Sequence, residues 1–99
     1  MVEEFRKLDP ELPTQTANTF LFIAMHEGCT MRELAQALGV AQSTMSRNVS
    51  ALSKIHRLGK AGLNLVQRDP DPYERRRVIV TLTPRGQKFR DTLISLTLE

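Results

Sequence analysis

The chain has 99 residues, 40% of them hydrophobic, with one cysteine and no tryptophan. That length suits a single domain with one modest core, and the sequence holds no apolar run long enough to cross a membrane. Glu3 and Glu4 make the N-terminus acidic, unlike a secretory signal, and Cys29 has no partner for an internal disulfide. We therefore expect a soluble, cytoplasmic protein.

The net charge of +3 is distributed unevenly along the chain. Residues 1–53 contain four basic and six acidic side chains, whereas residues 54–90 contain ten basic and three acidic ones, a net charge of +7. Such a segment is suited to bind a polyanion, but it is also what a solvated basic face without a partner would look like. The elements around it decide between these interpretations.

Residues 1–12 form a charged N-terminal arm, extended or folded as a short helix, and residues 13–99 form the domain proper. Apolar side chains recur at three- and four-residue spacing over residues 14–27, which predicts a helix with one buried face. Gly28 ends this helix. The side chains expected to face the core are Ala17, Phe20, Leu21, Ala24 and Met25.

Thr30 and Glu33 stand three residues apart, as in a capping box, and predict a second helix that continues to Leu38. Gly39 then provides the left-handed backbone that a sharp helix exit requires. The side chains of this helix that are expected to point inward are Met31, Leu34, Ala35 and Leu38.

A third helix is predicted over residues 41–54, with Met45, Val49 and Leu52 buried at four- and three-residue spacing. Residues 55–60 either extend this helix or fray from it. Its opposite face is polar and carries Gln42, Ser43, Thr44, Ser46, Arg47, Asn48 and Ser50. A face of this kind is typical of a recognition helix that enters the major groove of DNA.

Residues 63–68 and 77–82 have the composition of β-strands, and residues 69–72, which include two prolines, are expected to form the turn between them. Thr83 then caps a last helix that has Pro84 in its first turn, where the missing N–H of proline costs no hydrogen bond. The apolar side of this helix carries Phe89, Leu93, Ile94 and Leu96.

These elements predict a fold that is mainly α with a small β-hairpin, a winged helix-turn-helix DNA-binding domain. The chain resembles the winged-helix domain of the MarR family of bacterial transcription regulators in Leu34–Val40, in Ser43–Arg47 and in the run from Arg68 to Gly86. The resemblance covers residues 13–89, and the Leu-Thr-x-x-Gly pattern that closes the wing is its most specific part. It implies a sequence-specific regulator of transcription, a repressor, that binds a palindromic duplex as a homodimer.

Family members usually carry long helices before and after the winged domain, which build the dimer and border an effector pocket. The ends of this chain are short by comparison, so we expect a reduced regulator without a small-molecule effector, paired through its arm and its last helix. Ala41 stands where the family usually has Ser or Thr. The helix that follows is therefore expected to be capped by water, by Gln42 or by a DNA phosphate.

The predicted DNA-binding residues belong to the recognition helix (41–54) and to the wing (63–82). They are Gln42, Ser43, Thr44, Ser46, Arg47, Lys54, Arg57, Lys60, Arg75, Arg76 and Arg77. Gln can pair with adenine and Arg with guanine in the major groove, lysines and further arginines suit phosphates, and arginines at a wing tip suit a narrow minor groove. One tip arginine could instead pair with Asp71 or Glu74 and hold the shape of the hairpin.

No pattern of catalytic or metal-binding residues accompanies these elements, so we expect neither enzymatic activity nor a metal or other cofactor. His26 and His56 lie thirty positions apart without clustered ligands. Cys29 is interpreted as a small buried thiol in preference to a redox sensor. The alternative function is an accessory winged-helix module, either an architectural or recombination cofactor or a protein–protein adaptor.

Overall fold

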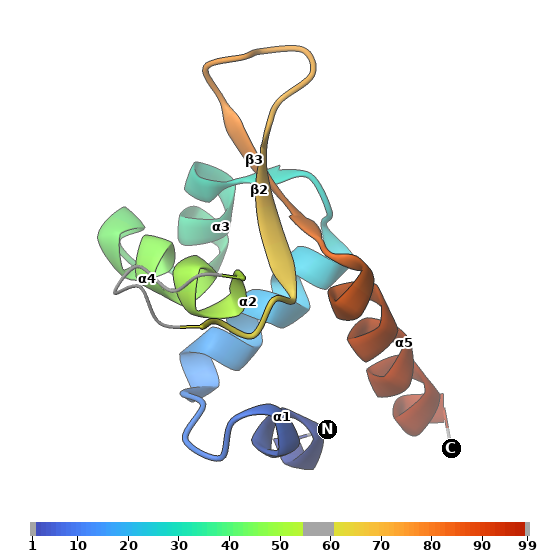
Figure 1. The fold of residues 1–99 in the computed structure, drawn as a ribbon. Helices are drawn as coiled ribbons and strands as arrows, with labels where there is room; N and C mark the ends of the chain where they lie inside the picture. The colour runs from blue at the N-terminus through green and yellow to red at the C-terminus, as the bar shows by residue number, and fades with distance from the viewer. Residues whose placement is uncertain (1, 55–60, 99) are drawn as a thin grey trace.

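The computed structural model describes residues 2–54 and 61–98. The elements in chain order are α1 (Val2–Leu8), α2 (Thr14–Met25), β1 (Cys29–Thr30), α3 (Met31–Leu38), α4 (Gln42–Leu52), β2 (Val66–Pro70), β3 (Val78–Leu82) and α5 (Pro84–Leu98). The β2–β3 hairpin projects away from the helices, and α1 and the far end of α5 lie at the opposite end of the domain (Figure 1). The fold is the predicted one, mainly α with a small antiparallel sheet.

Helix α2 is the centre of the core, but its buried face differs from the predicted one. Met25, which we expected inside, is 78% exposed, because the helix ends there and its inward face passes through Phe20 and Ile23. Two threonines share that face. The hydroxyl of Thr19 donates to Gln15 O (2.8 Å) and the hydroxyl of Thr16 donates to Asn48 Oδ1 (3.2 Å), so both polar groups are buried with a partner.

The capping box and the left-handed exit of α3 are both confirmed. The Thr30 hydroxyl accepts from Glu33 N (3.1 Å), and the Glu33 carboxylate accepts from Thr30 N (3.2 Å). Gly39 follows the helix with φ at 66°, and Val40 N donates to Ala35 O (3.1 Å). These contacts fix the turn that leads into α4.

The sheet has three strands in the order β1-β3-β2, one more strand than the sequence predicts. The extra strand, Cys29–Thr30, pairs with β3 through Val80 and Ile79, and it is too short to show an alternating pattern. The turn prediction for residues 69–72 is also wrong at its start, because Pro70 belongs to β2 and pairs with Val78. β2 is an edge strand, where a residue without an N–H costs no ladder hydrogen bond.

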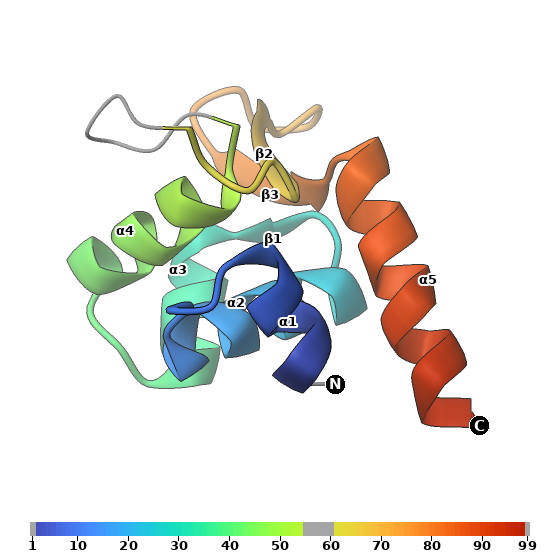
Figure 2. The same ribbon diagram turned by 60° about the horizontal axis from the view of Figure 1, so that its bottom comes forward.

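A triangle of phenylalanines joins the two ends of the chain to α2. The ring centroids of Phe5 and Phe89 are 5.1 Å apart, and those of Phe20 lie 5.9 Å from Phe5 and 5.4 Å from Phe89. Leu93 is also buried. We expected the arm and the last helix to pair with a second copy, but their side chains Phe5 and Leu93 lie within the core of the domain itself. Figure 2 shows α5 running along the side of the α1–α4 body.

Helix α5 starts at a close junction with the segment before β2. As predicted, Thr83 caps the helix, its hydroxyl accepting from Gly86 N (3.0 Å), and the same hydroxyl donates to Asn64 O (2.7 Å). Thr83 N donates to Leu65 O (3.1 Å). A Cβ placed on Gly86 would lie 1.9 Å from that Leu65 oxygen. The glycine of the Leu-Thr-x-x-Gly pattern is therefore required by backbone contact.

Candidate nucleic-acid interface

Helix α4 packs into the domain along one side and leaves the other side accessible. Met45, Val49 and Leu52 are fully buried, as predicted. Ala41 precedes the helix in an extended conformation and provides no side-chain cap, so the first turn keeps accessible N–H groups. Of the predicted contact residues on α4, three are exposed and two are half-buried: Gln42, Ser43 and Arg47 are exposed, and Thr44 and Ser46 are half-buried.

Asn48 belongs to the polar side of α4 but is engaged within the domain. Its amide nitrogen donates to Gln15 Oε1 (3.3 Å), and its amide oxygen accepts from the Thr16 hydroxyl. These bonds tie α4 to α2. Asn48 therefore orients the helix, and the exposed side chains near Arg47 are left to meet a ligand.

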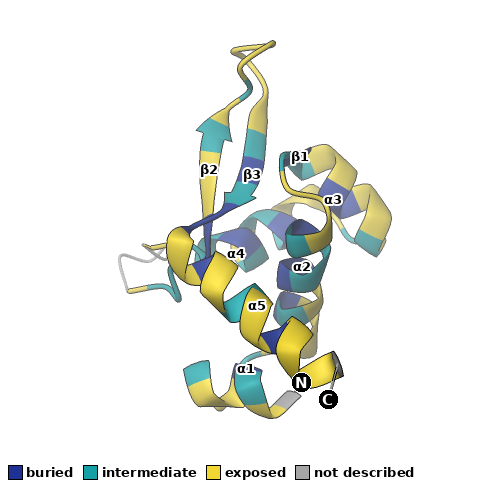
Figure 3. Ribbon diagram, turned by 90° about the vertical axis from the view of Figure 1, so that its right-hand side faces the viewer, coloured by how far each residue is buried: buried dark blue, intermediate teal, exposed yellow. Residues whose placement is uncertain are grey.

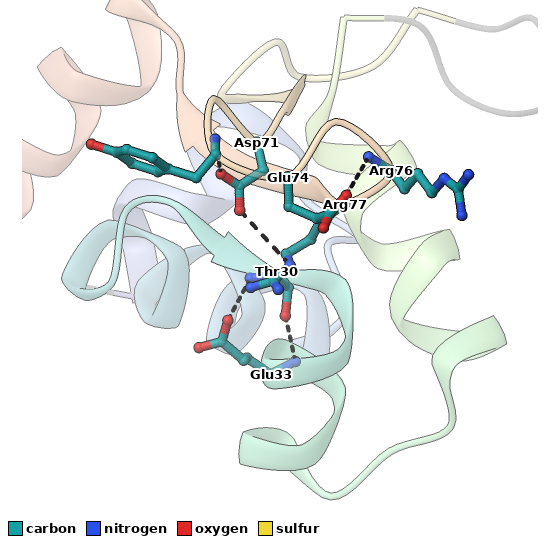
Figure 4. Close-up of polar contacts among 7 residues, drawn as sticks. Thr30, Glu33, Asp71, Glu74, Arg76 and Arg77 are labelled. Atoms are coloured by element: carbon teal, nitrogen blue, oxygen red, sulfur yellow. Dashed lines mark hydrogen bonds and ion pairs between the residues drawn. The ribbon is translucent and has the colours of Figure 1, made fainter.

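The tip of the wing is organised by Asp71. Its carboxylate accepts from Tyr73 N (2.8 Å) and lies 3.8 Å from Arg77 Nε, while Asp71 N donates to Arg77 O (2.9 Å) (Figure 4). Glu74 closes the turn, with its carbonyl oxygen accepting from Arg77 N (2.9 Å) and its carboxylate accepting from Arg76 N (3.5 Å). These bonds hold the backbone of the tip in a defined turn.

The three arginines of the tip have different surroundings. Arg77 is the one that pairs with Asp71, one of the two roles that the sequence left open. Arg75 and Arg76 are exposed, and within the described residues neither guanidinium forms an ion pair. Tyr73 beside them is 97% exposed. The wing tip therefore presents two uncompensated positive charges and one aromatic ring.

Arg68 is a residue that the sequence prediction missed. From β2 its Nη2 donates to Ser46 O (3.1 Å), to Ser50 Oγ (3.2 Å) and, at 3.5 Å, to Ser46 Oγ, all on α4. Side chains alternate along a strand, so Arg68 shares the helix-facing side of β2 with the buried Val66. The sequence did offer a signal for this contact, because a basic residue stands two positions after Val66 and therefore on the same face of the strand.

The remaining predicted positions differ in what the structure says of them. Lys54 is exposed just beyond α4, whereas Arg57 and Lys60 lie outside the described residues.

Cys29 is buried, and burial together with the nearby Glu33 carboxylate raises the pKa of its thiol. A thiol with a raised pKa stays protonated and unreactive at neutral pH.

A helix-turn-helix followed by a hairpin that projects past the second helix defines a winged helix-turn-helix domain. Within the described ranges, no three His, Cys, Asp or Glu side chains are grouped in a way that could hold a metal ion. No helix in the same ranges is long and apolar enough to cross a membrane.

Comparisons with known proteins agree on the family. Residues 11–54 match the model of the MarR family. The chain is 34% identical over 86 residues to the HTH-type transcriptional repressor NicR of Pseudomonas putida, a match that covers 87% of the chain and 49% of NicR. The chain thus spans about half the length of this curated relative.

Solved structures show the same fold. A MarR-like transcriptional regulator of Thermotoga maritima is 28% identical with a TM-score of 0.73, over 87% of this chain and 55% of its own. S. aureus MepR, in a complex with DNA, is 22% identical with a TM-score of 0.76, over 96% of this chain and 70% of its own. Residues 11–54 of the chain thus match the MarR family, and the domain has the winged helix-turn-helix fold of these regulators.

Proposed function

We propose that this protein is a sequence-specific regulator of transcription, a cytoplasmic repressor that binds duplex DNA with α4 in the major groove and the β2–β3 wing in the adjacent minor groove. The observation that carries the proposal is that Arg68 fastens the wing to a helix whose exposed face is polar. The exposed Arg75 and Arg76 at the wing tip add positive charge. The repressor NicR and the DNA complex of MepR support the same function.

The alternative, an accessory winged-helix module such as a protein–protein adaptor, is less well supported. An adaptor does not require a polar recognition face or unpaired arginines at the wing tip, whereas this domain has that face and, within the described residues, two tip arginines outside any ion pair. We propose neither enzymatic activity nor a cofactor, and we expect regulation without a small-molecule effector.

The proposal is tested by the salt dependence of DNA binding. We expect nanomolar affinity for a selected target duplex and weaker affinity for random DNA, with both falling steeply as salt rises, because each neutralised phosphate releases counterions. Selection of target sequences from a random library, followed by fluorescence anisotropy over a salt series, measures this. Affinity that is independent of salt between low and physiological ionic strength would contradict the proposal.

The division of roles between helix and wing gives a second prediction. Arg47→Ala should weaken binding to the selected duplex by about 1 to 3 kcal/mol and relax specificity at one base pair. Arg76→Ala should weaken binding to selected and random duplexes to a similar extent. Selection repeated with each variant checks this, and equal losses on both kinds of DNA for Arg47→Ala would show that this residue does not contact a base.

We propose further that the protein is a homodimer, since two recognition helices on half-sites about one helical turn apart read enough bases for useful specificity. Support comes from exposed apolar side chains of α2 and α5, where Met25 and Ile94 are 78% and 50% exposed. A groove of about 260 Å³ between Leu21 and Ile94 lies beside them. Figure 3 shows how much of α5 is exposed on this side.

A double variant Met25→Gln and Ile94→Gln should shift the protein from dimer to monomer in sedimentation at micromolar concentration, because it removes apolar area from the proposed interface. Point variants suit this test better than removal of α5, which carries the core residue Leu93. Thr92→Gln, on the same helix and also exposed, should leave the dimer intact. A wild-type monomer, or a dimer that the double variant does not weaken, would contradict the proposed interface.

A further inference from the structure

The contact between β2 and α4 borders a polar hollow. It measures about 430 Å³ and is lined by side chains from the end of α4, from the start of β2 and from the segments next to them, among them Ser50, Ser53, Lys54, Gln67 and Arg68. The described residues that line it include two basic side chains and no carboxylate. A concave surface with positive charge and hydroxyl groups suits an anion that accepts hydrogen bonds.

The acidic residue nearest in sequence is turned away from this hollow. Asp69 follows Arg68 in β2, and consecutive side chains of a strand point to opposite faces. Its carboxylate accepts from the Thr81 hydroxyl on β3 (3.1 Å). Arg68 is therefore not neutralised by its neighbour, and its charge stays available on the α4 side.

Arg68 is also held in place. All three of its hydrogen bonds to α4 use Nη2, on acceptors that belong to Ser46 and Ser50. A guanidinium has five N–H donors in a planar fork, so Nε and Nη1 keep donors for a ligand. Lys54, two residues beyond the end of α4, lines the same hollow as Ser50 and Arg68 and adds a second positive charge to it.

The proposed function places a DNA strand at this point. If α4 occupies the major groove and the wing occupies the adjacent minor groove, the sugar–phosphate backbone that separates these grooves must pass between α4 and the hairpin. Arg68 bridges that gap. We propose that the hollow is a seat for a backbone phosphodiester, bound by the guanidinium of Arg68 and the ammonium of Lys54, with Ser46 and Ser50 as the groups that position Arg68. This inference rests on the proposed function.

The seat makes a sequence-independent contact, so its test needs no knowledge of the target sequence. The probe is a fluorescein-labelled duplex of random sequence, titrated over a series of potassium chloride concentrations. Arg68→Gln should lower the slope of log affinity against log salt by about 0.9, the loss of one phosphate contact, and weaken binding by about tenfold at low salt. Lys88→Gln removes one exposed charge from α5. It should change both the salt slope and the affinity less than Arg68→Gln does.

Two conservative variants separate charge from positioning. Arg68→Lys should keep the wild-type salt slope, because the charge remains. Ser50→Ala should also keep the slope but weaken binding by about threefold, because Arg68 loses a hydrogen bond that orients it. Melting curves should show that every variant stays folded under the conditions of the titration. Ser50→Ala with wild-type affinity would overturn the positioning role.

The remaining outcomes decide the phosphate assignment. A wild-type slope in Arg68→Gln, or an equal loss in Lys88→Gln, would overturn the inference alone, whereas a wild-type protein that does not bind the duplex would overturn the proposed function as well. Millimolar inorganic phosphate at constant ionic strength should leave the difference between wild type and Arg68→Gln unchanged. If it abolishes that difference, the hollow is a site for free anions and the backbone assignment is wrong.

Discussion

Gly86→Ala should destabilise the domain by about 3 kcal/mol or more, a large fraction of the stability of a small domain. The added methyl group would lie 1.9 Å from Leu65 O and 2.9 Å from the Leu65 carbonyl carbon. Both are backbone atoms, and the same Leu65 oxygen accepts from Thr83 N. The clash can be relieved only by moving α5 away from the segment that leads into β2.

Urea unfolding followed by circular dichroism measures this effect. Gly39→Ala is the matched control, because an alanine there meets no atom within 4 Å and suffers only from the positive φ of 66°, which costs about 1 kcal/mol. At an ordinary position inside a helix, replacing glycine by alanine stabilises the protein. A loss of stability in Gly86→Ala would therefore come from the clash with Leu65. A Gly86→Ala variant as stable as the wild type would show that α5 does not approach Leu65 this closely.

Phe20→Ala should cost about 3 to 5 kcal/mol, the usual range for a fully buried phenylalanine. Phe20 is 0% exposed and contacts the rings of both Phe5 and Phe89, so its removal opens a cavity and also frees α1 and α5 from α2. The same urea titration should show a lower midpoint. Digestion with a protease should show that the two ends are cut first.

Tyr73→Ala provides the control for this second prediction. The ring is about as large as that of phenylalanine but is 97% exposed, so we expect a change below about 0.5 kcal/mol. Similar losses for the two variants would mean that the aromatic triangle contributes little and that α1 and α5 are held by other contacts.

Local chemistry made much of this fold predictable from the sequence. The capping box of Thr30 and Glu33 and the left-handed Gly39 each depend on residues close in the chain, and each is confirmed. The buried residues of α4 also follow from helical spacing alone. Such signals give element type and order, which is why the winged helix-turn-helix class could be predicted.

Features that depend on distant partners could not be predicted in this way. Strand β1 forms because Cys29 and Thr30 pair with the side of β3 that β2 leaves open. Pro70 is tolerated because β2 is an edge strand. Thr16 and Thr19 are buried because helix carbonyl and amide groups accept from their hydroxyls. The spacing of apolar residues does not reveal polar side chains that are buried with a hydrogen-bond partner. The sequence therefore predicts an inward face of α2 that includes Met25 and omits the two threonines.

In the candidate site, too, some features could be predicted from the sequence and others depend on distant partners. The exposed residues of α4 and the tip arginines follow from motif and charge, although their contacts with DNA stay predictions. Arg77 and Arg68 differ in the structure, since one pairs with Asp71 and the other bonds to α4. Both roles depend on which side of the hairpin a side chain faces, and the sequence fixes that only once the register of β2 with β3 is known.

The position of Tyr73 gives the protein a built-in spectroscopic reporter. The chain has one tyrosine and no tryptophan, so near-ultraviolet excitation selects this single ring, which lies at the exposed tip of the wing. Its emission should therefore follow events at the wing and be insensitive to changes in the core. Fluorine incorporated on the same ring would yield a single resonance, so that the environment of the wing tip could be recorded in otherwise unlabelled protein.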